Sequence, residues 1–252
     1  MNKLYRQLFI RLITLLLLTS SFTANADLNA SAELTPIDTK QFLMVSGLID
    51  PNTPMEKMYP YFKAEAQLAW KYYATHRMQQ AFARMDELGV VILWEAKNIQ
   101  EAKRAIEQMP MVKNKLIGYQ LYPVKFFNTL STLFSTDTPT VREVDTVAKT
   151  SSFILITQPV TGVTAEQVAP YLKEQALAIW HNYQTGLFRQ LFDRGNLSQK
   201  GGEVIMMMAN DVADAKQIAE QLPLVKNKLV NYQLIPVRYF FPFGDLFRSS
   251  KY

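Results

Sequence analysis

The chain has 252 residues, of which 48% are apolar, so it can bury a core that suits two small domains or one larger one. It contains no cysteine, which excludes a disulfide framework and a thiolate metal site. Without the three basic residues of the first 26 positions, 27 Lys+Arg become 24 against 22 Asp+Glu, a net charge of +2. A charge this small gives no support to nucleic-acid binding.

Residues 1–26 have the pattern of a secretory signal peptide. Lys3, Arg6 and Arg11 precede a short apolar run, and Ala24-Asn25-Ala26 forms a small-x-small cleavage site. The run is too short for a stable bilayer span, although an N-terminal membrane anchor is the alternative interpretation. We therefore expect cleavage near Ala26, a periplasmic or secreted protein without a stable membrane anchor, and an N-terminal linker over residues 27–40.

After the signal, the sequence contains an internal repeat. Residues 111–127, MVKNKLIGYQLYPVKFF, correspond to residues 224–240, LVKNKLVNYQLIPVRYF, with 11 of 17 positions identical. Residues 59–73 correspond in the same way to 169–183, and 101–110 to 214–223. Such an internal repeat predicts two copies of one structural unit. We assign repeat 1 to residues 41–135, a Thr-rich linker to 136–150, and repeat 2, with an aromatic C-terminal tail, to 151–252.

Each copy predicts the same elements in chain order. A short apolar strand (42–46; 153–157) precedes a helix opened by a capping box at Thr53 or Thr164, with a kink or restart at Pro60 and Pro170. Two strands follow (76–86 and 89–96; 186–195 and 203–209), and then a second helix capped by Asn98 or Asp211 and ended by Pro110 or Pro223. The last strand (115–124; 228–237) is stopped by its proline.

The order in each copy is therefore βαββαβ, the ferredoxin-like arrangement, in which both helices cover one face of an antiparallel sheet. The other face must also be covered. We expect an α+β protein whose two ferredoxin-like repeats lay their bare sheet faces together and form an intramolecular dimeric α+β barrel. The chain is then a pseudo-dimer, with a higher oligomer as a further option.

This pattern resembles the muconolactone isomerase-like group of dimeric α+β barrel proteins, with two copies fused in tandem. The resemblance rests on a first strand such as FILIT, a helix with A…W..Y, strands such as QAFAR and QLFDR, and the EQLPL that follows the second helix. It covers about 41–135 and 152–248. Relatives on this fold include isomerases of small lactones, cofactor-free monooxygenases and haem proteins. The resemblance identifies no catalytic residue, and an export signal departs from a catabolic isomerase of the cytoplasm.

The strongest ligand-binding candidates lie on the second strand of each copy. Arginine and an aromatic ring on the barrel face would hold the carboxylate and the ring of a small acid. The alternative is a solvated arginine at a strand edge, or one that pairs with a nearby acid such as Glu95 or Asp193. The candidates, which alternate on one side of their strands, are Gln80, Phe82 and Arg84, with Gln190, Phe192 and Arg194 in the second copy.

The remaining candidates carry more ordinary explanations as well. Tyr119 and Tyr232 lie mid-strand, where a tyrosine is a ligand contact or proton donor, or else a core residue with its hydroxyl at the rim. Trp94 aligns with Met207, so its role is not duplicated. Lys113-Asn114-Lys115 and its copy at 226–228 would border an anion pocket or form a solvated turn. The aromatic tail FFPFGDLFRSSKY packs against the fold or contacts a partner.

His76 and His181 do not occupy matching positions and have no second ligand at metal spacing, so we expect neither a metal nor a cofactor. The sequence favours an exported protein that binds, and in one version isomerises, a small apolar or aromatic acid or lactone between its halves. The alternative is a non-catalytic structural or interaction module with a filled barrel. No nucleic-acid partner is expected.

Overall fold

The computed structural model describes residues 39–127, 149, 151–194 and 201–239. Its first half has eight elements: β1 (Gln41–Leu48), the short 3-10 helix η1 (Met55–Lys57), α2 (Tyr59–Ala74), β2 (Met78–Arg84), β3 (Val90–Glu95), α3 (Ile99–Glu107), α4 (Pro110–Lys113) and β4 (Ile117–Phe126).

The second half repeats this order with one extra break in its first helix. Its elements are β5 (Ser151–Pro159), α6 (Ala165–Val168), the 3-10 helix η2 (Ala169–Tyr171), α7 (Leu172–Gln184), β6 (Phe188–Asp193), β7 (Glu203–Ala209), α8 (Val212–Glu220), α9 (Pro223–Lys226) and β8 (Val230–Tyr239). The restart predicted at Pro170 is thus present, because η2 separates α6 from α7.

The eight strands form one closed antiparallel sheet in the order β1-β3-β2-β8-β5-β7-β6-β4. Within each half the ladders are long; β5 and β8, for example, are paired from Ser152 with Val237 to Pro159 with Val230. Between the halves they are short: Phe82–Arg84 of β2 faces Val237–Tyr239 of β8, and Lys125 and Phe126 of β4 face β6. The prediction of an α+β fold with an antiparallel barrel is therefore confirmed.

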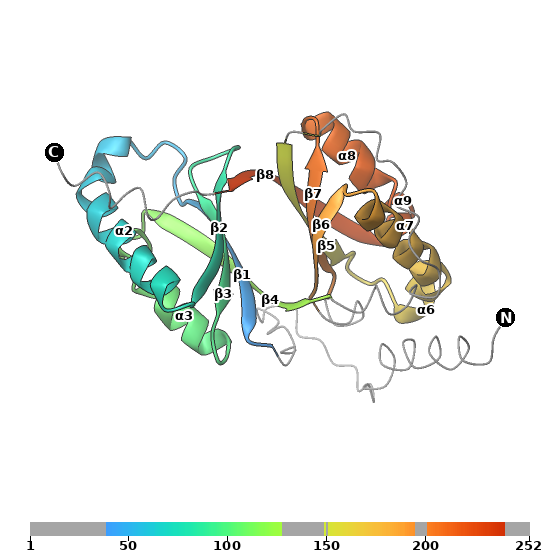
Figure 1. Cartoon of the computed structure of the whole chain (residues 1–252), viewed down its shortest axis with the longest axis horizontal. Helices are drawn as coiled ribbons and strands as arrows, with labels where there is room; N and C mark the ends of the chain where they lie inside the picture. Colours follow the sequence, from blue (N-terminus) through green and yellow to red (C-terminus); the bar gives the residue numbers. More distant parts are fainter. Residues whose placement is uncertain (1–38, 128–148, 150, 195–200, 240–252) are drawn as a thin grey trace.

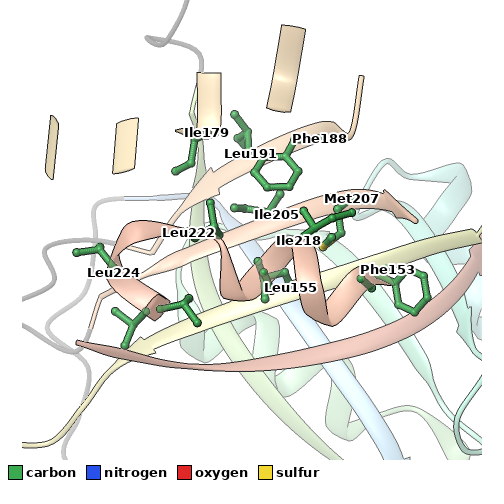
Figure 2. Packing of buried hydrophobic residues seen from close by; sticks show 14 of the residues in the cluster. Phe153, Leu155, Ile179, Phe188, Leu191, Ile205, Met207, Ile218, Leu222 and Leu224 are labelled. Atoms are coloured by element: carbon green, nitrogen blue, oxygen red, sulfur yellow. The ribbon is translucent and has the colours of Figure 1, made fainter. Parts of the chain in front are cut away.

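The helices cover the outside of the barrel, and the two halves of the sheet face each other between the helical layers (Figure 1). In the second half, α7, α8 and α9 enclose an apolar core against β5–β8, with Phe153, Leu155, Phe188 and Ile205 buried in it (Figure 2). The first half has an equivalent outer core, which contains Trp94 and Ile106.

A third core fills the inside of the barrel. Every strand contributes to it, because side chains alternate along a strand between the helix face and the barrel face. Its buried members are Leu43, Val45, Phe82, Val91, Leu93, Val124, Ile154, Ile156, Phe192, Val204, Ile235 and Val237, all 5% exposed or less. The two halves therefore share one apolar interior.

Four prolines that were predicted to end a helix or a strand do not end it. Pro110 and Pro223 do not end the second helices; each opens a short further helix, α4 or α9, where a missing amide hydrogen is harmless. Pro123 and Pro236 do not stop the last strands, which run on to Phe126 and Tyr239. A proline fits there because the pairing of these strands with the other half begins only after it.

The helix caps were predicted in part. Asn98 and Asp211 cap α3 and α8, where their side-chain oxygens accept hydrogen bonds from the amides of Glu101 and Asp214 at 2.9 and 2.8 Å. In the second half, Gln167 accepts the amide hydrogen of Thr164, as a capping box requires. The box predicted at Thr53 is wrong, since Pro54 caps η1 without a side-chain bond and α2 begins only at Tyr59.

Several sequence predictions fall outside the described residues, namely the signal peptide, most of the N-terminal and central linkers, and the aromatic tail. Among the helices that the structure does describe, none combines the length and apolar character needed to cross a bilayer.

Candidate functional site

Arg84 and Arg194 occupy matching places at the ends of the second strands, and each guanidinium binds a backbone carbonyl of its own half. Nη1 of Arg84 donates to the carbonyl oxygen of Ser46 at 3.1 Å, and Nη1 of Arg194 donates to that of Thr157 at 2.6 Å. Both side chains belong to the barrel face. Arg84 pairs across the strands with Val237, a member of the barrel core, and Arg194 lies over Tyr122, which packs against the same core.

A glycine and a hydroxyl complete this arrangement in each half. The backbone amide of Arg84 donates to Gly89, and that of Arg194 donates to Gly202, at 3.0 and 2.9 Å. The hydroxyls of Ser46 and Thr157 bridge to the next strand, where they accept the amide hydrogens of Val90 and Glu203. Each arginine therefore connects the end of its own strand to the two neighbouring strands, β1 and β3 in the first half and β5 and β7 in the second. The sequence did not reveal this structural role.

The two arginines differ in their charge partners. Arg84 forms ion pairs with Asp86, at 2.6 Å, and with Glu87. Partial burial opposes ionisation of Asp86, but its hydrogen bond with Arg84 and the charge of Arg84 outweigh this and lower its pKa. The positive charge of Arg84 is thus already compensated within its own half.

Arg194 forms no ion pair with any residue that the structure describes, although it is only 6% exposed. Its guanidinium carbon lies 4.4 Å from the centre of the Tyr122 ring, a cation–π contact between the two halves. Its Nε is buried without a hydrogen-bond partner. Burial lowers the pKa of Arg194, and only Tyr122 acts in the opposite direction. A buried, uncompensated cation of this kind is costly unless something else pairs with it.

Tyr122 is the site residue that sequence reasoning missed. It packs against the barrel core and pairs with Leu43 across β1. Burial raises its pKa, and the charge of Arg194 partly offsets that. The sequence did contain a sign of this difference between the halves, because the position that matches Tyr122 in the second half is Ile235. The acids that serve Arg84 are likewise missing after Arg194, where residues 195–200 read GNLSQK.

The other second-strand candidates line the barrel face with the arginines. Phe82 and Phe192 are buried in the barrel core, where their rings meet Tyr239 and Phe126 at the junctions between the halves, with centroids 5.3 and 5.5 Å apart. Gln80 and Gln190 are half-buried and lie opposite Leu93 and Met206. The Oε1 atom of Gln190 is buried without a partner.

Tyr119, Tyr232 and Trp94 do not join this group, because they point to the helices. The two tyrosine hydroxyls donate to Glu107 and Glu220, at 3.2 and 3.0 Å, and burial together with Glu107 raises the pKa of Tyr119 to about 12. Trp94 is buried in the outer core of the first half against Tyr72, at 5.1 Å between ring centroids, and its Nε1 has no partner.

The histidine and lysine candidates lie away from the barrel face. His76 and His181 are exposed, and so are Lys113, Lys115 and their counterparts, Lys226 and Lys228. Lys115 and Lys228 adopt positive φ angles of 55° and 56° in the turn before the last strand, so the solvated turn is the structure present. Within the described ranges, no three His, Asp or Glu side chains gather as a metal site would require.

No family model matches the chain, and no curated protein matches its sequence. Solved structures match its fold. A candidate chlorite dismutase has a TM-score of 0.52 at 12% identity, over 82% of this chain and 98% of its own. The chlorite dismutase of Candidatus Nitrospira defluvii in complex with imidazole has a TM-score of 0.51 at 7% identity, over 84% and 95%.

A candidate monooxygenase from Lactobacillus acidophilus also aligns, with a TM-score of 0.43 at 10% identity, over 79% of this chain and 94% of its own. Identities this low establish a related fold and nothing more. The chain therefore has the α+β barrel fold found in chlorite dismutase structures, and its function must be argued from its own residues.

A haem, which the resemblance implies for some members of this fold, does not fit the histidines of this chain. A haem inside the barrel takes an axial ligand, most often histidine. Both histidines are exposed and belong to the helical side of their halves, at the end of α2 and within α7.

Proposed function

We propose that this chain is an exported binding protein for a small organic anion, with a single site at Arg194 and Tyr122. The observation that carries the proposal is the buried guanidinium of Arg194, which has an unpaired Nε and no acidic partner among the described residues. Its counterpart Arg84 has two acids, so the site exists in one half only.

A carboxylate suits this place best. An arginine pairs with a carboxylate through two parallel N–H donors, and Arg194 uses only its Nη1 on Thr157. The Tyr122 ring and the apolar barrel core lie next to the guanidinium, so they favour a ligand with an apolar or aromatic body. Because Nε is buried, an anion can accept its hydrogen bond only if neighbouring side chains move locally.

The proposal is restricted to binding. Isomerisation of a lactone or acid needs a group that moves a proton at the bound ligand. No described carboxylate pairs with Arg194, and the pKa of the neighbouring Tyr122 is raised, which makes its phenolate a rarer species at neutral pH. A muconolactone isomerase-like descent remains compatible with the fold, without the activity.

We further propose that the two halves are ferredoxin-like units that arose by duplication of one βαββαβ ancestor. The repeated element order supports this. So does the repetition of the arginine, glycine and hydroxyl at the strand ends, since these residues recur with the same hydrogen bonds in both halves.

Thermal unfolding with a panel of small aromatic and lactone-derived acids tests the binding site, and Arg194→Met is the decisive variant. It keeps the bulk of the side chain and removes the charge. Loss of a charge-assisted hydrogen bond is expected to weaken binding by about 1.5–3 kcal/mol. The ligand-induced rise in melting temperature, present in the wild type, should then vanish or shrink strongly.

Arg84→Met is the matched control, because it changes the same strand position in the other half. We expect it to lower the melting temperature, since it leaves Asp86 and Glu87 without their partner, but to keep the full response to ligand. An equal loss of ligand response in both variants would contradict a single site. Equal binding by wild type and Arg194→Met would remove the site altogether.

The second candidate function is a structural or interaction module with a filled barrel. It is favoured by one observation, the apolar core of buried side chains that occupies the barrel interior. Under this alternative, no acid in the panel raises the melting temperature of the wild type, and native mass spectrometry of protein taken from its host finds no co-purifying small molecule.

A further inference from the structure

The helix α2 carries a row of exposed aromatic side chains on its outer surface. Tyr59, Phe62, Trp70 and Tyr73 are 57%, 38%, 38% and 44% exposed. Positions 59 and 70, and likewise 62 and 73, are eleven residues apart, about three helical turns, so all four lie on one face. Neighbouring rings contact each other, with centroids 5.8 Å apart for Tyr59 and Phe62 and 5.9 Å for Trp70 and Tyr73. We call these four residues the α2 aromatic row.

The described end of the chain lies beside this half. β8 belongs to the second half by sequence, but its last residues pair with β2 of the first half, and Tyr239 stacks edge-on against Phe82. Residues 240–252, FFPFGDLFRSSKY, which lie outside the described residues, therefore begin at the first half.

The matching junction indicates the direction in which the chain continues. β4 pairs with β6 of the second half, and Phe126 meets Phe192 as Tyr239 meets Phe82. The next residue, Phe127, donates its amide to the carbonyl of Leu191 and packs against the helix-side core of the second half. Phe240 matches Phe127 in the sequence repeat, so an equivalent continuation would lead toward the helix side of the first half.

The two halves also differ in a complementary way. Where α2 has Tyr59 and Phe62, the second half has Ala169 and Leu172. The segments that follow the last strands differ in the same sense, with FFPF at 240–243 against FNTL at 127–130. The more aromatic segment thus begins beside the half that has the more aromatic helix. Eight extended residues span about 26 Å, which matches the roughly 21 Å length of the α2 aromatic row.

We propose that residues 240–252 dock on the α2 aromatic row and strap the first half to the end of the second. The occupant is the chain's own C-terminal segment, and the binding is apolar and aromatic. The proposal is independent of the anion site, since no residue of the α2 aromatic row takes part in that site.

Paramagnetic relaxation in the full chain tests the docking, because the absence of cysteine allows a single spin label at Ser249→Cys. We expect amide signals of α2 to be broadened and those of α7 to be unaffected. A mixture of spin-labelled chain with unlabelled, ¹⁵N-enriched chain should show no broadening. Broadening only in the mixture would assign the row to a second copy, and an unaffected α2 would mean that the segment docks elsewhere; either result overturns the proposal.

A pair of surface variants gives a second readout. Tyr73→Ser removes one ring of the row, whereas Tyr183→Ser removes the exposed tyrosine at the same position of α7, which is 45% exposed. If docking protects the segment, Tyr73→Ser should raise the rate of chymotrypsin cleavage within residues 240–247 by about fivefold or more, because cleavage follows the population of the released form. Tyr183→Ser should leave the rate unchanged. Equal rates in both variants and the wild type would contradict the proposal.

Discussion

Residues at matching positions of the two halves do the same structural work with different electrostatics. Glu65 and Gln175 occupy the same place on the first long helix. Each accepts the first amide hydrogen of the short helix that follows a proline, from Met111 at 2.9 Å and from Leu224 at 3.2 Å. Likewise, Arg84 and Arg194 each donate a hydrogen bond to a backbone carbonyl at the matching position of their own half. The hydrogen bonds that hold the strands and helices in place are thus present in both halves, whereas the charges around them differ.

The clearest difference in charge, apart from the partners of Arg194, is Glu203, which stands where the first half has Val90. Its Oε2 accepts a hydrogen bond from Gln175 at 2.9 Å, and Asp193 lies opposite it on β6. Burial, together with the nearby charge of Asp193, raises the pKa of Glu203 to about 7, although the hydrogen bond from Gln175 acts in the opposite direction. A carboxyl group with a raised pKa favours the folded state in its protonated form.

Glu203→Gln is therefore expected to stabilise the protein at alkaline pH. The folded pKa lies above the ordinary value of 4.5, so the stability from this group is present below that value and is lost as the pH rises through about 7. Between pH 5 and 8 the free energy of unfolding of the wild type should fall, and the variant should remove this decline. At pH 8 we expect it to be more stable by about 1–3 kcal/mol.

Urea unfolding at several pH values measures this difference. Glu174→Gln, on the exposed surface of α7, is the control and should leave the pH profile unchanged. Parallel profiles for wild type and Glu203→Gln would mean that the carboxyl group is not perturbed in the folded protein.

At the scale of elements, the sequence predicted the strands and helices well, because their signals are local. The alternation of apolar residues located the barrel-facing Phe82 and Phe192, and Asn98 and Asp211 marked helix starts. Pairings between distant strands left weaker signals. Whether Pro123 ends a strand depends on where the other half begins to pair. Tyr122 contacts Arg194 only because β4 runs beside β6. Asp86 and Glu87 follow Arg84 closely in the sequence, but the sequence does not show that the guanidinium is buried, so it did not identify them as its charge partners.

The strand ends yield a further prediction, at Gly202. Its φ angle is +148°, and a Cβ atom there would lie 2.3 Å from the carbonyl oxygen of Thr157, the oxygen that Arg194 binds. Gly202→Ala must therefore displace the backbone of β5 or β7, at a cost of at least about 2 kcal/mol in the free energy of unfolding. It should also weaken the bond between Arg194 and Thr157.

Gly162→Ala is the matched control for this change. Its φ angle is +87°, but nothing lies within 4 Å of the added atom, so only the backbone conformation is strained. We expect a loss of about 1–2 kcal/mol. Chemical unfolding of both variants measures the difference, and equal losses would show that close approach to Thr157 does not matter.

At the scale of the whole molecule, the strands of both halves close a single barrel. The two junctions between the halves consist of a few paired residues each, so the shared apolar interior provides most of the contact between them. A single half exposes its part of that interior, which for the second half includes Ile154, Ile156, Phe192, Val204 and Ile235. A face that buries on the order of 800 Å² per partner is the size of an ordinary specific interface.

Each half produced alone should therefore dimerise or aggregate, and the two halves should do so with different strength. In a dimer of residues 39–135, each Arg84 brings its own Asp86 and Glu87 to the new interface. In a dimer of residues 151–252, each Arg194 would face Ile235 in place of Tyr122, because Ile235 takes that position in the repeat, so two guanidinium groups would be buried without a ring or an acid. We expect the first dimer to be the tighter one, and Arg194→Met to tighten the second. Light scattering and sedimentation at several concentrations measure both. A folded, monodisperse monomer of either half would mean that the halves do not depend on a common core.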